Sequence, residues 1–116
     1  MMTDPQCLFC KIIAGKLPSD QVYSDEHVVV FKDIYPKAPV HLLIVPREHI
    51  ISLNEINEKH DELMGYIIRL LPQIAKKQGL DNGFRTIINT GPGGGQIVFH
   101  LHIHLLGGHT LGSVGF

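Results

Sequence analysis

The sequence predicts an α+β fold in which about five antiparallel strands form one sheet, with a short and a long helix packed on one face of that sheet. Three observations lead to this prediction. Residues 100–106 alternate histidine with aliphatic residues, which is typical of a half-buried strand. Residues 57–77 carry apolar residues at helical spacing. Short runs rich in β-branched residues, such as residues 27–33, are bounded by turn-forming residues.

The first half of the predicted fold contains one helix and three strands. Residues 7–14 are expected to form a short helix, which a following glycine can end and a proline prevents from continuing. Residues 21–24 and 27–33 are expected to form two strands joined by a tight turn. Residues 42–45 form the third predicted strand, which ends at Pro46 because proline has no N–H to donate.

The second half of the predicted fold contains the long helix and the last two strands. Apolar residues along one face of residues 57–77 predict an amphipathic helix. Pro72 lies inside this segment and predicts a kink, because the proline ring crowds the preceding turn. Residues 84–89 and 97–106 predict the last two strands.

Length and composition restrict the possible classes of protein. The chain has 116 residues, of which 44% are hydrophobic, so we expect one domain spanning residues 1–116. The net charge of -1 supplies no basic field of the kind that nucleic acid binding needs, whereas small nucleotides remain possible partners. No run of residues is apolar enough for a signal peptide or a membrane span, so we expect no membrane partner and a cytoplasmic location.

The alternating histidines are the most informative motif. On a strand, His100, His102 and His104 would face one side, about 6.6–6.8 Å apart, close enough for one phosphate and its leaving group to contact two of them. One alternative is a solvated polar face, which is normally built from Lys, Glu, Thr or Ser. Another is a metal site, but a zinc ion about 2.0–2.1 Å from each nitrogen can take at most one or two ligands from a straight strand.

A glycine-rich segment, residues 89–96, leads into this strand. Glycines allow positive φ angles and let backbone N–H groups approach an oxyanion, which favours a phosphate-binding role. The alternative is a flexible turn. No Lys-Ser or Lys-Thr pair follows the glycines, so the segment is not a Walker loop.

Together these motifs resemble the histidine triad (HIT) family of nucleotide hydrolases and transferases, and its Hint branch most. The resemblance lies in residues 94–96, the three histidines and residues 107–108. Residues 31–46 resemble the nucleoside-pocket segment of the family, and residues 8–13 resemble its N-terminal helix. The resemblance implies a HIT-like fold and a homodimer in which the long helix and the strand before the glycine loop join two sheets into one.

The resemblance also implies a mechanism. His102 matches the nucleophile of the family, His104 the neighbour that contacts the phosphate, His41 the residue that backs the nucleophile, and Asn89 a phosphate-site residue. A neutral imidazole can attack phosphorus when one nitrogen is free and the other is held by an acceptor. The expected enzyme is a purine nucleoside phosphoramidase that acts on nucleoside 5′-phosphoramidates or acyl nucleotidates through a nucleotidyl-histidine and releases the nucleoside monophosphate.

The implied partners are purine nucleotides of the AMP or GMP type. Asp33 matches the carboxylate that accepts hydrogen bonds from both ribose hydroxyls, and apolar residues, Leu8 among them, match the slot for the base. Adenine and guanine are not distinguished by such a slot. The full set of nucleotide-binding residues implied by the resemblance is Phe9, Ile12, Phe31, Asp33, Ile34, Leu43, Asn89, Gly95, Gln96 and His104.

Two departures from the family keep other functions open. Ile97 stands where better-known Hint relatives carry a hydroxyl that assists the leaving group, and residues 109–116 lack the tryptophan that some relatives place near the substrate. The alternatives are a dinucleoside polyphosphate hydrolase of the fragile histidine triad type, or a nucleotide-binding scaffold whose catalysis is vestigial. Gly107 and Gly108 after the triad favour the Hint branch over the first alternative.

Both cysteines lie in one Cys-x-x-Cys motif, Cys7 to Cys10. A reducing cytosol disfavours a disulfide, so the motif suggests metal binding, redox chemistry or inert burial. Some histidine triad relatives with this motif bind zinc, and the resemblance implies His49 and His100 as the other two ligands. Such a site would be structural, because four protein ligands leave no open position. No organic cofactor is expected.

Overall fold

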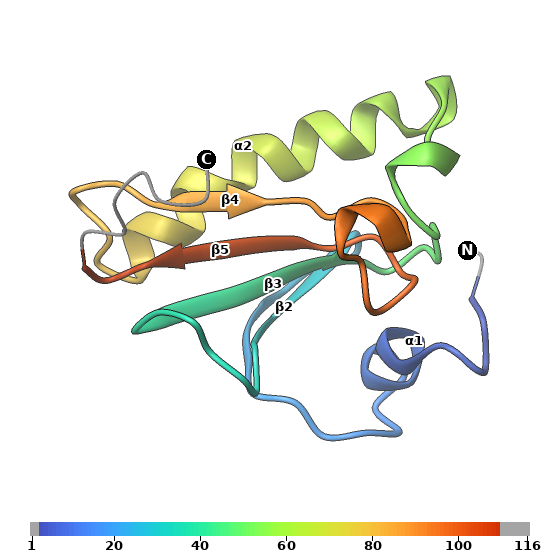
Figure 1. Cartoon of the computed structure of the whole chain (residues 1–116), viewed down its shortest axis with the longest axis horizontal. Coiled ribbons are helices and arrows are strands. Elements are labelled where there is room, and N and C mark those ends of the chain that lie inside the picture. The colour runs from blue at the N-terminus through green and yellow to red at the C-terminus, as the bar shows by residue number, and fades with distance from the viewer. Residues whose placement is uncertain (1–2, 110–116) are drawn as a thin grey trace.

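The computed structural model describes residues 3–109, in which five strands form one antiparallel sheet (Figure 1). Their order across the sheet is β1-β2-β3-β5-β4, so β1 and β4 are the edges. The α-helices and strands are α1 (Leu8–Ile13), β1 (Gln21–Ser24), β2 (Val28–Lys32), β3 (Val40–Pro46), α2 (Asp61–Lys77), β4 (Arg85–Ile87) and β5 (Ile103–Gly107). Short 3-10 helices occupy η1 (Leu53–Glu55), η2 (Glu58–His60) and η3 (Pro92–Gly94). The predicted α+β class and five-stranded antiparallel sheet are confirmed.

The prediction that both helices cover one face of the sheet is wrong. Figure 1 shows α2 along one face and α1 below the other. Val28 and Val30 pack in the cluster that includes α2, whereas Val29 and Phe31 pack in the cluster that includes α1. A run of consecutive apolar residues in a strand needs cover on both faces. Residues 28–31 of β2 form such a run, which was therefore a signal for helices on opposite sides.

The last strand is shorter than predicted. β5 begins at Ile103 instead of at residue 97, and its pairing with β3 ends at the pair Ile44 and Ile103. Continuing that register would place Leu101 opposite Pro46, which has no N–H to donate to the ladder. The N–H of Leu101 instead donates to the carbonyl oxygen of Ile50 at 2.6 Å. His100 and His102 therefore lie on irregular backbone before the strand.

The long helix begins later than predicted and runs past its proline. η2 occupies the first predicted turn, and α2 then continues as one helix from Asp61 to Lys77 with Pro72 inside it. Its buried side, including Ile67, Leu70 and Ile74, packs against the sheet. No helix within residues 3–109 combines the length and the apolarity that a membrane crossing requires.

The alternation in β5 behaves as predicted. Ile103 and Leu105 are almost fully buried in the core under α2. His104 pairs with Leu43, which packs under α1, so its side chain lies on the α1 face. The side chain of His104 thus lies on the face opposite α2.

Candidate active site

A pair of histidines forms the centre of the site. His41 comes from β3 and His104 from β5, and the two strands are hydrogen-bonded neighbours. Their rings lie 5.2 Å apart between centroids, and His41 Nε2 is 2.9 Å from His104 Nδ1. The sequence resemblance assigned His41 to support His102, whereas the hydrogen bond in the structure runs to His104.

Backbone geometry determines which nitrogen of each ring carries a proton. The N–H of Lys37 donates to Nδ1 of His41 at 3.0 Å, so a neutral His41 holds its proton on Nε2. That proton is donated to Nδ1 of His104, with Asp33 Oδ2 as a second acceptor 3.4 Å away. His104 must then carry its own proton on Nε2. The pair therefore presents an N–H donor from His104.

His102 is held in the opposite tautomer. Its Nδ1 lies 2.7 Å from the backbone carbonyl oxygen of His100, which can only accept, so Nδ1 carries the proton and Nε2 is unprotonated. The ring packs edge-on against Phe9 at 5.1 Å and against His104 at 5.1 Å between centroids. A fixed ring with a free nitrogen beside an N–H donor is the arrangement that nucleophilic attack on phosphorus requires.

The electrostatics keep these imidazoles neutral. Burial lowers the pKa of His104 to about 4, and the neighbouring histidines and the Lys37 ammonium act in the same direction. Burial also lowers the pKa values of His41 and His102, although the Asp33 carboxylate opposes the change at both rings. At neutral pH the free nitrogen of His102 is therefore available.

The glycine-rich segment is a closed turn. Gly91 and Gly95 have φ angles of 71° and 83°, which side-chain-bearing residues rarely adopt. The N–H groups of residues 94–96 donate to carbonyl oxygens of Gly91 and Pro92 within the same turn. These three N–H groups are thus already hydrogen-bonded within the turn. The prediction that the backbone N–H groups of this segment bind a phosphate is therefore corrected for residues 94–96.

Gln96 supports that turn. Its side chain is buried, accepts a hydrogen bond from the N–H of Gly91 at 2.8 Å and donates to the carbonyl oxygens of Ile51 and Val98 at 2.7 and 3.0 Å. Because all of these groups belong to the protein, the side chain is not free to bind a nucleotide. We therefore assign Gln96 a positioning role in place of the predicted nucleotide contact.

A pocket of about 670 Å³ opens beside the histidine pair. Its lining residues are Asp33, Tyr35, Lys37, His41, Arg85, Ile87, Asn89, Ile97, His104, Leu106 and His109. Asp33, His41, Asn89 and His104 are thus brought together as predicted. His102, Gly95 and Gln96 are not part of this lining, because His102 lies deeper, beside Phe9.

The residues predicted to form the apolar base slot are mostly core. They pack between α1 and the sheet, and Phe9 and Phe31 meet edge-on at 5.5 Å. Ile34 is the exception, with 80% of its surface exposed, and Leu8 is 46% exposed. The slot residues that are at most 9% exposed are Phe9, Ile12, Phe31 and Leu43. Tight packing of α1 on an apolar sheet face explains their burial.

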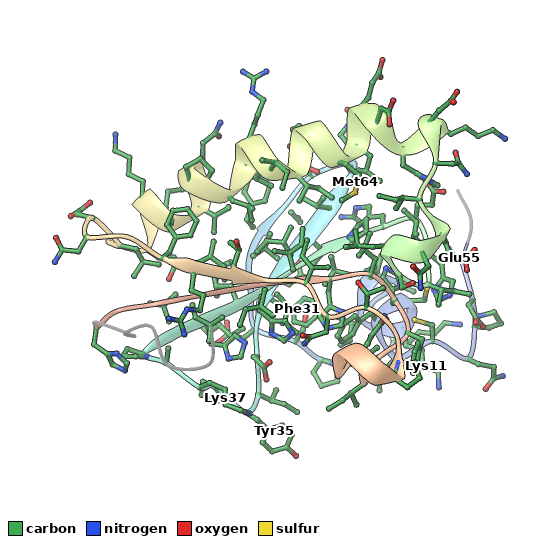
Figure 2. All side chains as sticks on the ribbon, turned by 45° about the horizontal axis from the view of Figure 1, so that its top comes forward. Lys11, Phe31, Tyr35, Lys37, Glu55 and Met64 are labelled. Atoms are coloured by element: carbon green, nitrogen blue, oxygen red, sulfur yellow. The ribbon has the colours of Figure 1, made fainter. Side chains whose placement is uncertain are left out.

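Sequence reasoning did not single out several residues in the pocket. Arg85 and Ile87 belong to β4, and Ile87 pairs directly with His104. Tyr35 and Lys37 lie on the loop between β2 and β3 (Figure 2). Arg85 and Ile87 would have been identified by recognising that the strand before the glycine-rich segment pairs with the histidine strand.

A second cluster brings both cysteines to the other end of the histidine motif. Nδ1 of His100 lies 3.3 Å from Sγ of Cys7 and 3.5 Å from Sγ of Cys10, and Nδ1 of His49 lies 3.4 Å from Sγ of Cys10. All four ligand atoms lie within 4.8 Å of one another. A zinc tetrahedron has edges of about 3.3–3.8 Å for these atoms, so the donor set fits zinc.

The protonation of His100 also fits a metal ligand. Its Nε2 lies 2.7 Å from the carbonyl oxygen of Pro46, so Nε2 carries the proton and Nδ1 presents its lone pair to the thiols. A carbonyl partner of this kind is the usual way in which proteins orient a ligating histidine. Of the three histidines of the motif, His100 joins this cluster.

Comparisons with known proteins identify the family. The model of the scavenger mRNA decapping enzyme C-terminal binding family matches residues 6–113. A HIT family hydrolase from Clostridium thermocellum has a similar structure, with a TM-score of 0.94 and 46% identity over 98% of this chain and 100% of that one. The chain belongs to the histidine triad family. This histidine triad protein is a hydrolase, as are relatives named purine nucleoside phosphoramidase and HIT family hydrolase.

Two curated relatives of this histidine triad protein have informative names. The purine nucleoside phosphoramidase of Escherichia coli K12 is 44% identical over 110 residues, which cover 94% of this chain and 92% of that protein. The 14 kDa zinc-binding protein of Zea mays is 43% identical over 112 residues, which cover 95% and 88% of the two chains.

The two departures from the family can now be located. Ile97 lines the pocket and is 87% exposed, so an apolar side chain stands at the mouth of the site. Residues 110–116, in the segment where some relatives carry a tryptophan, lie outside the described residues.

Proposed function

We propose that this hydrolase cleaves purine nucleoside 5′-phosphoramidates, or the mixed anhydrides of acyl nucleotidates, and releases the nucleoside monophosphate. The observation that carries the proposal is the pair of opposite tautomers. The carbonyl oxygen of His100 leaves Nε2 of His102 unprotonated, and His41 leaves a proton on Nε2 of His104. A nucleophile and a donor to a phosphate oxygen thus lie side by side.

The reaction proceeds in two displacements. Nε2 of His102 attacks phosphorus, the bond from phosphorus to the leaving group breaks, and His104 donates to a phosphate oxygen. An amine leaving group takes up one proton from solvent as it departs. Water then attacks phosphorus and gives up one proton to solvent, and the bond to His102 breaks, which frees the nucleoside monophosphate. His102 needs no general base, because its attacking nitrogen is already unprotonated.

Other pocket residues would orient the nucleotide. The side-chain amide of Asn89 can donate to a second phosphate oxygen. Asp33 Oδ1 accepts the N–H of Tyr35 at 2.8 Å, which fixes the carboxylate, and its remaining lone pairs can accept from the ribose hydroxyls. We propose that the purine base stacks beside the exposed Ile34, at the edge of the apolar cluster under α1.

The test compares release of nucleoside monophosphate from adenosine 5′-phosphoramidate and from a diadenosine polyphosphate. We expect rapid phosphoramidate cleavage that is abolished in His102→Ala and retained in His27→Gln, a control at an exposed histidine outside the pocket. Preference for the polyphosphate would instead favour the fragile histidine triad type. Tight monophosphate binding without turnover of either substrate would favour a nucleotide-binding scaffold.

We also propose that Cys7, Cys10, His49 and His100 hold a structural zinc ion. The geometry of the donor set and the name of the Zea mays relative support this proposal. Zinc would join α1 to the backbone just before β5. We expect about one zinc per chain by elemental analysis, and its loss together with a lower Tm in Cys10→Ser. Protein purified without chelator that contains no zinc would contradict the proposal.

We further propose a homodimer, with purine nucleotides as ligands at each site. Within residues 3–109, β4 pairs only with β5, so its other edge is available to a second copy. Ile68 on α2 and Phe84 before β4 are 53% and 39% exposed, which supplies apolar surface beside that edge. Sedimentation equilibrium should give twice the mass of the chain, and a monomer at micromolar concentration would refute this assembly.

A further inference from the structure

Asp4 lies beside the Cys/His cluster and contacts two of its members. The cluster consists of Cys7, Cys10, His49 and His100. Oδ2 of Asp4 lies 3.9 Å from Nε2 of His49, which is within ion-pair distance. The backbone N–H of Asp4 donates to Sγ of Cys10 at 3.5 Å. Within residues 3–109, no other carboxylate lies within ion-pair distance of either histidine of the cluster.

Hydrogen bonds within the N-terminal segment fix the carboxylate of Asp4. Its Oδ1 accepts the N–H of Gln6 at 2.9 Å, and its carbonyl oxygen accepts the N–H of Cys7 at 3.0 Å. An aspartate that accepts the N–H two residues further on forms a common turn. This turn leads into α1, because Cys7 is the N-cap of that helix. Since Oδ1 is bonded within the turn, Oδ2 is the oxygen that faces His49.

The carboxylate of Asp4 determines which nitrogen of His49 carries a proton. Nδ1 of His49 lies 3.4 Å from Sγ of Cys10, so Nδ1 faces the cluster and Nε2 faces Asp4. A ligating imidazole needs a lone pair on the nitrogen that faces the metal and a proton on the other nitrogen. An ionised carboxylate can only accept a hydrogen bond. Asp4 therefore favours the proton on Nε2 and leaves Nδ1 available to a metal.

The two histidines of the cluster are oriented by different kinds of acceptor. Nε2 of His100 faces the backbone carbonyl oxygen of Pro46 at 2.7 Å. Among the described residues, Nε2 of His49 has Asp4 as its one acceptor. The side chain of His49 is only 13% exposed, which leaves little room for water to replace that partner. The orientation of His49 therefore depends on a side chain that can be substituted.

We propose that Asp4 is a positioning residue that orients His49 as a zinc ligand and raises the affinity of the Cys/His cluster for zinc. This inference rests on the proposed zinc ion and adds a residue that does not itself bind the metal. The backbone N–H of Asp4 acts in the same direction, because a donor to Sγ of Cys10 favours the thiolate that zinc binds. The negative charge of Asp4 also attracts a divalent cation.

The expected effect on zinc affinity follows from the exposure of Asp4. Loss of a residue that orients a ligating histidine typically weakens metal binding by about 10- to 100-fold. The side chain of Asp4 is 46% exposed, and its contact with His49 is at 3.9 Å. Because water partly screens such a contact, we expect a change near the lower limit, about 10-fold.

Asp4→Asn removes the charge without opening the turn. The carbonyl oxygen of asparagine can still accept the N–H of Gln6. The amide nitrogen then takes the place of Oδ2 and presents N–H donors to Nε2 of His49, which favours a proton on Nδ1 and opposes metal binding.

Glu48→Gln is the matched control for this substitution. It removes one negative charge at the residue next to His49 in the chain. The carboxylate of Glu48 faces Nε2 of His60 at 3.2 Å and not the Cys/His cluster. Both variants therefore lose the same charge, and only Asp4→Asn changes the partner of His49.

The experiment measures the dissociation constant for zinc in the full chain. Zinc-loaded wild type, Asp4→Asn and Glu48→Gln are each titrated with a chelator whose absorbance changes when it takes up zinc. Tm is measured for each protein with and without excess chelator, because a residue that only holds the turn would affect both forms equally. Substitution of cobalt for zinc supplies a visible spectrum that reports the number of thiolate ligands in each variant.

We expect Asp4→Asn to bind zinc about 10-fold more weakly than wild type and Glu48→Gln to bind it unchanged. Unchanged affinity in Asp4→Asn, or equal weakening in both variants, would overturn the role of Asp4 and leave the proposed zinc ion intact. A loss of Tm in Asp4→Asn that is the same with and without chelator would assign Asp4 to the turn alone and also overturn the proposal. Wild type that binds no zinc would overturn both.

Discussion

Acid should reduce the activity of this enzyme only at pH values well below the ordinary pKa of histidine. Burial and neighbouring positive charges lower the pKa of His104 from 6.5 to about 4. His104 must be neutral to accept the proton of His41 at Nδ1. Because the pKa is lowered, the charged and inactive form accumulates only below about pH 4–5. The acid limb of kcat/KM should therefore lie below 6.5.

The size of the effect can be calculated from this shift. At about pH 5, a histidine with a pKa of 4 is about 90% neutral, whereas one with a pKa of 6.5 is about 3% neutral. The two cases differ by a factor of about 30 in the fraction of active enzyme. A difference of this size exceeds the error of ordinary rate measurements.

The assay measures kcat/KM for adenosine 5′-phosphoramidate from about pH 8 to about pH 3.5, a range that contains both values considered for His104. His102→Ala supplies the uncatalysed rate at each pH. Circular dichroism at each pH separates titration from unfolding, because the lowered pKa also affects stability. The folded protein keeps its full free energy of unfolding above pH 6.5, where His104 is neutral in both the folded and the unfolded chain. As the pH falls toward 4, the free energy of unfolding decreases, and the loss is about 1–2 kcal/mol at about pH 5.

An acid limb at 6.5 or above, in protein that circular dichroism shows to be folded, would refute this reasoning. Such a result would mean that His104 is as well solvated in the pocket as an exposed histidine, so that burial does not lower its pKa. Lys37→Met provides a second test, because removing its positive charge should move the acid limb to higher pH.

Three further predictions concern stability. Gln96→Leu should lower the free energy of unfolding by about 2–3 kcal/mol in denaturant titrations, because it leaves the N–H of Gly91 and two carbonyl oxygens without partners. Asp25→Asn should lower the free energy of unfolding by about 1–2 kcal/mol at neutral pH. Burial raises the pKa of Asp25, but hydrogen bonds from two tyrosines and two backbone N–H groups outweigh it and lower the pKa to about 2. The difference between the variant and the wild type should therefore disappear as the pH falls from 3.8 toward 2. Gly108→Ala should lower Tm, since its φ is 106° and an added Cβ would lie 2.7 Å from a proline side chain, whereas Gly65→Ala in open space on α2 should raise Tm. Equal effects of the two glycine substitutions would contradict the last prediction.

Much of the site could be predicted from local sequence, because its chemistry depends on residue type and spacing. Alternation in the last strand placed Ile103 and Leu105 in the core and His104 on the opposite face, as the structure confirms. The metal-ligand set of two cysteines and two histidines came from family resemblance, and the structure brings all four together.

Other features depended on contacts between distant segments. The tautomers of His41 and His102 follow from a backbone N–H of Lys37 and a backbone carbonyl of His100, and no side-chain pattern reports which backbone groups a ring will meet. The role of Gln96 was likewise hidden, because a glutamine beside glycines can bind a ligand or hold the turn, and only the packing of the turn against Ile51 decides between them.

The sequence by itself therefore determined the fold class, the bounds of the helices and strands to within a few residues except at the start of β5, and the residues that can carry the chemistry. It could do so because periodicity and side-chain chemistry are local properties. The tertiary structure decided that the helices cover opposite faces, that β5 begins only at Ile103, and that Lys37 shares a pocket with His104. These features depend on which strands pair and in which register, and pairing joins residues that lie far apart in the chain.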